Sequence, residues 1–176
     1  MHSRLHVIAL SGGIATGKST CSRLIQEVFP ETVLFDADAC VASQYEAEDV
    51  IEELKAHFGN ALQLSCGRID KAYLRQRVFS NPKERSFLEQ VFHPRVRKEC
   101  LALLSETARN HSSRLFVADI PLLFENGFDL GQSANLLVAT SRETQVVRLK
   151  NRNAWNDNTV EAVLSSQMPI GAKLRL

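Results

Sequence analysis

The sequence lacks the features that define several specialised classes of protein. Its four cysteines are scattered: none forms a Cys-x-x-Cys pair, and none stands at zinc-ligand spacing from a histidine. We therefore expect reduced thiols in a reducing, cytoplasmic location, with no disulfide framework and no zinc site. No apolar run approaches the roughly 20 residues that a membrane helix needs, so we expect no membrane partner.

An excess of charge of one sign is also missing. The 176 residues include 21 basic and 20 acidic side chains, for a formal net charge of +1, and no internal repeat or low-complexity tract is present. Nothing global therefore favours nucleic acid as a partner, and any bound anion must be held by a local arrangement of residues. The length suits one domain with one sizeable core, and nothing in the sequence indicates an oligomeric state.

Four short apolar runs predict a parallel β-sheet, and they cover residues 5–10, 32–35, 115–118 and 134–139. A glycine-rich stretch follows the first run. After it, apolar residues recur at helical spacing, at Cys21, Leu24, Ile25 and Val28. The order strand, glycine loop, helix, strand is one βαβ unit and indicates an α/β fold with helices on both faces of the sheet.

The pattern between the second and third runs is helical. We expect one helix to end at Gly59, a second to be capped by Asp70, and a third to begin at Asn81-Pro82. Because proline disfavours the α region for the residue before it, His93-Pro94 should end that third helix, and a further helix should follow. Capping boxes predict two later helices, starting at Thr140 and Asn158.

These elements predict three regions. Residues 1–36 and 113–140 would form a nucleotide-binding core. Residues 37–112 would form a helical insert that binds the acceptor, because such a segment is far too long for a simple crossover loop. Residues 141–176 would form a helical lid and a truncated C-terminal region.

The glycine stretch matches the phosphate-binding P-loop pattern, Gly12-x-x-x-x-Gly17-Lys18-Ser19, between a strand and a helix. Backbone N–H groups can surround a triphosphate only where no Cβ blocks their approach, and the helix N-terminus adds further donors. Lys18 would reach the β- and γ-phosphates, and the Ser19 hydroxyl would bind Mg²⁺. The residues expected to contact the nucleotide are Gly13, Ala15, Thr16, Gly17, Lys18, Ser19, Thr20 and Arg152.

A P-loop alone does not name an activity. The base-reading Asn-Lys-x-Asp of GTPases is absent, and a small core with a large helical insert is typical of a small-metabolite kinase. Such an enzyme needs a carboxylate facing the acceptor hydroxyl, and Asp36 and Asp38 follow the second strand, at the edge where open α/β sheets bind ligands. The alternative for either aspartate is a helix cap or a turn.

Cations should stabilise the transferred phosphoryl group. Arg148 and Arg152 lie four residues apart on one predicted helix and so share a face, although a solvated helix face is the alternative. His93 stands near Arg97 at the predicted helix break, which would suit a phosphate-bearing acceptor; a structural cap is the alternative. Asp119 ends the third strand, where it could hold Mg²⁺ or simply precede a turn.

Together these motifs resemble the dephospho-coenzyme A kinase family. The matching segments are Leu10 to Thr20, Asp36-Ala37-Asp38, His93-Pro94, Asp119-Ile120-Pro121-Leu122-Leu123-Phe124-Glu125, Arg148, Arg152 and Gln167-Met168-Pro169. The resemblance implies ATP-dependent phosphorylation of the ribose 3′-hydroxyl of dephospho-CoA, the last step of coenzyme A synthesis. It implies Lys18, Asp38 and Arg148 as catalytic residues, with His93 and Arg97 near the acceptor.

The sequence also departs from the family pattern. Asn153 follows Arg152 where the family usually has aspartate, and Ile170-Gly171 replaces more polar residues. Family members normally continue about 20 to 30 residues beyond the position of Leu176, so a chain that ended there would have a bare sheet edge and an incomplete adenine pocket. Two alternatives stay open: another small-metabolite or nucleoside kinase on the same core, and a nucleotide-binding fragment without turnover.

Overall fold

A computed structural model describes residues 5–110, 113–123, 125 and 127–176. Phe124, part of one family-like segment, lies outside the described residues. The chain divides into two compact units. The first, here called the sheet unit, comprises Met1–Ala37 and Leu101–Leu176, and the second, here called the helical unit, comprises Asp38–Cys100.

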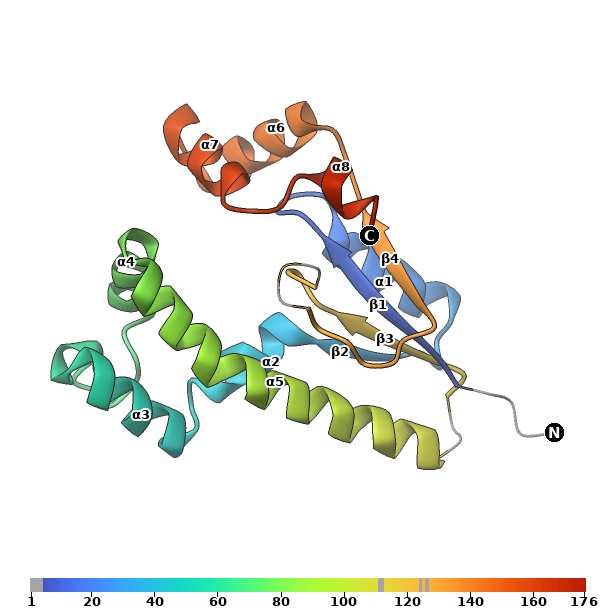
Figure 1. The fold of residues 1–176 in the computed structure, drawn as a ribbon, viewed down its shortest axis with the longest axis horizontal. Coiled ribbons are helices and arrows are strands. Elements are labelled where there is room, and N and C mark those ends of the chain that lie inside the picture. The colour runs from blue at the N-terminus through green and yellow to red at the C-terminus, as the bar shows by residue number, and fades with distance from the viewer. Residues whose placement is uncertain (1–4, 111–112, 124, 126) are drawn as a thin grey trace. The chain divides into compact units, whose positions relative to one another are not determined.

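The sheet unit is built on four parallel strands (Figure 1). In the order of the sheet they are β2 (Val33–Asp36), β3 (Leu115–Asp119), β1 (His6–Gly12) and β4 (Ala134–Val138). The two central strands carry the core: Ala9 and Leu10 of β1 are fully buried, as are residues 116–118 of β3. The predicted strands and the P-loop type of α/β fold are confirmed.

The strand β4 forms an edge of the described sheet, because it pairs with β1 on one side and with no described strand on the other. Its first three residues are exposed, and Leu136 retains 39% of its accessible surface. The predicted helix α1 (Lys18–Val28) is present, but its apolar stripe is not buried: Leu24 is 47% exposed and Val28 67%. Amphipathic spacing thus located this helix without revealing what its apolar face contacts.

Three further helices complete the sheet unit: α6 (Arg142–Asn153), α7 (Asp157–Ser165) and α8 (Ile170–Lys173). The predicted starts of α6 and α7 are wrong by one or two residues. Ser141 rather than Thr140 caps α6, accepting from the Thr144 N–H at 3.3 Å, and Asn156 rather than Asn158 caps α7. In both cases the extended residue whose side chain reaches the third helical N–H decides the boundary.

The helical unit contains most of α2 (Ala37–Gln44), then α3 (Glu48–Phe58), a 3₁₀ turn (Asn60–Leu62), α4 (Lys71–Ser80) and the first turns of α5 (Pro82–Asn110). The predicted caps at Gly59, Asp70 and Asn81 are confirmed. The core of the unit is an apolar cluster from α3 to α5, made of Val50, Leu54, Phe58, Leu62, Ile69, Leu74, Val91 and Phe92.

The predicted helix break at His93-Pro94 is wrong, because α5 continues through Pro94. Proline removes one N–H from the helix, yet Val91 and Phe92 before it and Val96 after it are buried, so packing holds both sides in helical register. The Arg95 guanidinium donates to the Val91 carbonyl at 2.7 Å, next to the site of the lost bond. Tertiary burial therefore overrides the local preference.

The cysteines are free, as expected. Burial raises the pKa of Cys100 on α5 to about 12, with Cys40 of α2 adding to the effect and Arg97 opposing it. Cys66 is exposed in the turn that joins Gln63 to Ile69, and a hydrogen bond with Arg68 lowers the pKa of its thiol.

Within the part of the chain that the structure describes, no helix is both long and apolar enough to cross a membrane.

Candidate functional site

The phosphate loop, residues 12–18, connects the end of β1 to the start of α1. Two of its residues adopt left-handed backbone angles, Ala15 with φ of 59° and Gly17 with φ of 104°. Glycine takes that conformation without strain, and Gly17 occupies the N-cap of α1. The turn thus delivers the chain to a helix N-terminus, where the first N–H groups have no intrahelical acceptor.

Gly12 is required by packing against the neighbouring strand. A Cβ at this position would lie 2.8 Å from the carbonyl oxygen of Val138 and 2.7 Å from the hydroxyl of Thr16. The Thr16 hydroxyl itself donates to the Gly13 carbonyl at 2.9 Å, which closes the loop from inside. The first glycine of the motif therefore lets the loop leave the sheet between β1 and β4.

Lys18 forms an ion pair with Asp119 Oδ1, and the Ser22 hydroxyl donates to Asp119 Oδ2 at 2.7 Å. The strand register explains this proximity, because Asp119 at the end of β3 lies beside Leu10 of β1. The Asp119 side chain is only 5% exposed, so a lysine and a hydroxyl offset the cost of burying its charge. Ser19 is exposed in the first turn of α1; the magnesium role predicted for Ser19 and Asp119 stays a prediction.

Helix α6 contacts the phosphate loop through Arg148 and, as described next, through Gln145. Arg148 Nη1 donates to the carbonyl oxygens of Ala15 and Thr16, both at 3.0 Å. Arg152 lies one turn later and is exposed. The structure thus brings Lys18 and Arg148 to the same loop, as the predicted site requires.

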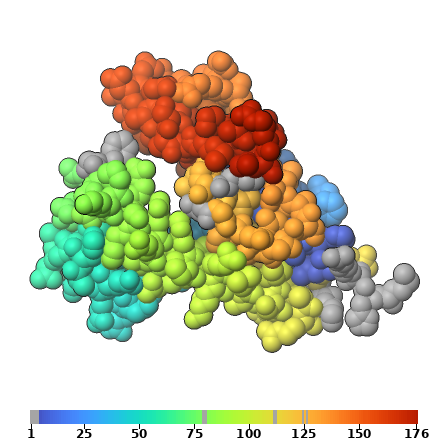
Figure 2. All heavy atoms as spheres, viewed as in Figure 1, coloured from blue at the N-terminus to red at the C-terminus, as the bar shows by residue number. Residues whose placement is uncertain are grey.

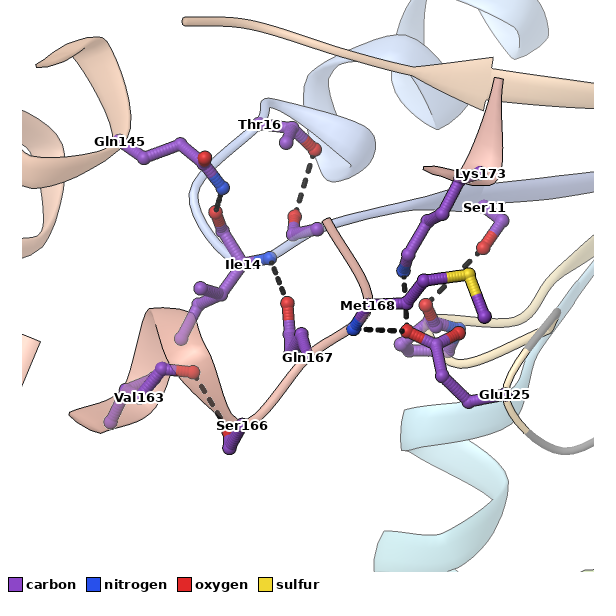
Figure 3. Close-up of polar contacts among 12 residues, drawn as sticks. Ser11, Ile14, Thr16, Glu125, Gln145, Val163, Ser166, Gln167, Met168 and Lys173 are labelled. Carbon is purple, nitrogen blue, oxygen red and sulfur yellow. Dashed lines mark hydrogen bonds and ion pairs between the residues drawn. The ribbon is translucent and has the colours of Figure 1, made fainter. Parts of the chain in front are cut away.

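Two contacts to the loop were not predicted from the sequence. Gln145, also on α6, donates from Nε2 to the Ile14 carbonyl at 2.6 Å, and Gln167 accepts from the Ile14 N–H at 2.9 Å (Figure 3). The helical spacing of Gln145 and Arg148 could have indicated the first contact, since side chains three residues apart share a helix face. Gln167 lies in the family-like Gln-Met-Pro segment, which carried no assigned role.

A cavity of about 230 Å³ adjoins these two glutamines. Among its lining residues are Gly13, Arg142, Gln145, Gln167, Met168 and Pro169. Arg142 also pairs with Glu161 of α7, with an N–O distance of 2.5 Å. The cavity is therefore walled by the phosphate loop, by α6 and by the segment after α7.

The predicted acceptor residues lie in the helical unit. Asp38 is exposed in the first turn of α2, whereas Asp36 is the exposed last residue of β2, in the sheet unit. His93 is half-buried and Arg97 exposed, one turn apart on the continuous helix α5. Val41 of α2 packs against the apolar cluster that includes Val91 and Phe92 of α5, so α2 lies beside this part of α5.

The neighbouring cation Arg95 has a structural role in the helical unit. Its Nη2 pairs with Asp49 at 3.0 Å and with Glu53 at 2.9 Å, both on α3. These ion pairs tie α5 to α3 and hold the pKa of Asp49 below its usual range.

Comparison with known proteins gives one consistent result. The profile of the family described as dephospho-CoA kinase matches residues 6–176. The dephospho-CoA kinase of Geobacillus kaustophilus is 36% identical over 169 residues, which cover 96% of this chain and 83% of that protein. The dephospho-CoA kinase of Wolinella succinogenes is 36% identical over 177 residues, covering 99% and 84%.

Solved structures agree with the sequence comparison. The crystal structure of TT1252 from Thermus thermophilus is 34% identical, with a TM-score of 0.79 over 98% of this chain and 85% of that one. The dephospho-CoA kinase from Campylobacter jejuni has a TM-score of 0.64 over 96% and 83% of the two chains. At 24% identity the latter supports the fold alone.

Proposed function

The chain belongs to the dephospho-CoA kinase family, and on that premise we propose that it transfers the γ-phosphoryl group of ATP to the ribose 3′-hydroxyl of dephospho-CoA. The observation that carries the proposal is the phosphate loop at the N-terminus of α1, which contains the cation Lys18 and is contacted by the cation Arg148. A phosphoryl transfer enzyme works mainly by positioning and by neutralising charge, and this loop supplies both.

At the nucleotide end, the loop N–H groups hold the phosphate oxygens and Lys18 neutralises charge on the β- and γ-phosphates. For this, Lys18 exchanges its carboxylate partner Asp119 for phosphate oxygens. Arg148 donates from Nη1 to two loop carbonyls, so its Nη2 can donate to the phosphoryl group during transfer. Arg152, one turn farther along α6, contributes a second positive charge.

The oxygen ligands that Mg²⁺ prefers are present at the loop. We propose that the Ser19 hydroxyl binds the ion and that Asp119 acts on it through its carboxylate. Bound there, Mg²⁺ would neutralise charge on the triphosphate. Asp119 suits this role because its buried carboxylate is already held in place by Ser22.

At the acceptor end, Asp38 would orient the 3′-hydroxyl and take its proton, and His93 and Arg97 would bind the phosphate-bearing part of dephospho-CoA. Their support is their place in the sequence: Asp38 follows β2 by two residues, and His93 and Arg97 share a face of α5.

An ADP-release assay with dephospho-CoA, compared with a panel of nucleosides, tests the proposed reaction. We expect turnover with dephospho-CoA and a product heavier by one phosphoryl group, identified by mass spectrometry as carrying it on the 3′-oxygen. Transfer to a nucleoside but not to dephospho-CoA would indicate a different acceptor. ATP binding without transfer to any acceptor would indicate a nucleotide-binding protein without turnover.

A further inference from the structure

The peptide groups of Ile14, in the middle of the phosphate loop, are held by two glutamines from distant parts of the sequence (Figure 3). Gln167 accepts from the Ile14 N–H at 2.9 Å, and Gln145 donates to the Ile14 carbonyl at 2.6 Å. Each backbone group fixes which end of its glutamine amide faces the loop, since an N–H needs an oxygen and a carbonyl needs an N–H. The Ile14 side chain also packs beside the cluster of Leu149, Val160 and Leu164.

Gly13 lets both glutamines come this close. A Cβ on Gly13 would lie 3.1 Å from Gln145 Nε2 and 3.5 Å from Gln167 Oε1. A side chain here would therefore press on the Gln145 amide, whereas it would make an ordinary contact with the Gln167 amide. The second glycine of the motif thus fits the loop to its protein supports as well as to a phosphate.

Gln167 belongs to a segment here called the C-terminal strap, residues 166–173, and the residues that follow Gln167 in this strap hold it in place. The Met168 N–H donates to Glu125 Oε1 at 3.2 Å, and Lys173 Nζ lies 2.7 Å from the same oxygen. The Lys173 side chain is fully buried, so its charge depends on this carboxylate. Figure 2 shows the last residues of the chain in red.

A phosphate loop needs such support because its N–H dipoles converge on one point and repel each other when no anion lies between them. A loop that is held open before the nucleotide arrives binds it with less loss of conformational entropy. Gln167 is suited to this task, since it accepts from one of the loop N–H groups and thereby orients the peptide that contains it.

We propose that Gln167 is a positioning residue for nucleotide binding: it fixes the Ile14 peptide so that the loop is preorganised for a triphosphate, and the Glu125–Lys173 pair keeps Gln167 in place. This inference rests on the proposed function only in taking the ligand of the loop to be a nucleoside triphosphate. The acceptor plays no part in it.

Replacing Gln167 by methionine tests the proposal, because methionine has a similar length and no amide oxygen. ATP affinity is measured by calorimetric titration without acceptor, and kinetic constants are measured with dephospho-CoA. For Gln167→Met we expect about tenfold weaker ATP binding and a higher KM for ATP, with the KM for dephospho-CoA unchanged. Gln26→Met, at an exposed position on α1, is the matched control and should bind ATP like the wild type.

A second variant provides a readout that a purely structural role would not affect. Gln167→Glu keeps the acceptor oxygen but adds a negative charge near the phosphates. Relative to the wild type at each pH, its ATP affinity should be poor at pH 8 and recover only as the pH falls toward about 4.3, where the introduced carboxyl becomes protonated. Gln167→Met should show no such recovery, because it offers no acceptor at either pH.

Several results would overturn the proposal. One is ATP affinity in Gln167→Met that equals or exceeds the wild-type value. Another is a fall in ATP affinity accompanied by a higher KM for dephospho-CoA and a lower melting temperature, which would make Gln167 merely structural. If Gln167→Met does not fold, a Gln167→Glu variant without pH-dependent recovery would also refute it. A wild-type protein that binds ATP yet does not phosphorylate dephospho-CoA would refute the proposed function and leave this test intact.

Discussion

The phosphate loop and the helical unit are stabilised in different ways. Although Ile14 and Ala15 pack beside an apolar cluster, the shape of the loop depends on directed contacts to backbone atoms, from Thr16, Gln145, Arg148 and Gln167. The helical unit depends on an apolar cluster and on ion pairs at its edges, such as Arg95 with Asp49. The comparison teaches that loop contacts should control nucleotide binding, whereas contacts within the helical unit should control stability.

The change with the largest expected effect is Lys18→Ala. It removes the main positive charge at the loop, so turnover should fall about 10²- to 10³-fold and ATP binding should weaken. Steady-state kinetics and ATP titration measure both effects, and circular dichroism checks the fold, since Asp119 loses its ion-pair partner. Wild-type kinetics in this variant would contradict the assignment of the loop.

Asp38→Asn tests whether the helical unit contributes to chemistry at all. If Asp38 acts on the acceptor hydroxyl, kcat should fall about 10²-fold while ATP affinity stays close to the wild-type value. Kinetics with varied ATP and varied dephospho-CoA separate the two effects. Equal losses in kcat and in ATP affinity would assign Asp38 to the nucleotide site instead and would break the comparison.

Gly12→Ala addresses the packing of the loop against β4. The added Cβ would meet a backbone oxygen at 2.8 Å, so the free energy of unfolding should fall by about 1–3 kcal/mol and ATP affinity should fall with it. Urea denaturation and ATP titration give the two values. Gly171→Ala is the matched control, because open space surrounds that glycine and it lies within α8. A Gly12 variant that behaves like this control would show that the loop tolerates displacement.

The smallest effect on catalysis is expected for Glu84→Gln in the helical unit. Glu84 accepts from Arg77 at 2.7 Å and lies 2.8 Å from His57, and the hydrogen bond from Arg77, then that from His57, lowers the pKa of Glu84 below its ordinary value of 4.5. Its ionised form therefore stabilises the fold at neutral pH, and this stabilisation is lost as pH falls below about 4.5 toward the lowered pKa.

The glutamine variant should melt several degrees below the wild type at pH 7, and this gap should shrink as the pH falls below 4.5. Thermal melts from pH 7 to pH 3.5 measure it, with Glu99→Gln, an exposed change on the same helix, as the control. ATP affinity should not change. A loss of ATP affinity would mean that the helical unit also shapes the phosphate loop.

The sequence predicted the parts of the molecule that depend on local chemistry. The glycine loop, the four strands and the caps at Asp70 and Asn81 follow from backbone rules that act over a few residues. The break at Pro94 was predicted wrongly because burial on both sides of the proline outweighs its local preference. The caps at Ser141 and Asn156 were missed because neighbouring residues offered equally good capping patterns.

The contacts that hold the loop could not be predicted in the same way. Gln167 meets Ile14 across 153 positions of sequence, and a glutamine carries no charge or spacing pattern that marks such a partner. The burial of Lys173 was also not predicted, since lysine is almost never fully buried. It is buried here because it pairs with Glu125. Only the fold brings these residues together.

The turn that carries Cys66 gives the helical unit a natural point of chemical attachment. Its thiol is exposed and more readily ionised than an ordinary cysteine because of Arg68, whereas Cys100 is buried with a pKa near 12. A maleimide dye used in limiting amount should therefore modify Cys66 first, without any mutation. Fluorescence from that dye would then report on the helical unit, while the phosphate loop, which contains no cysteine, stays unlabelled.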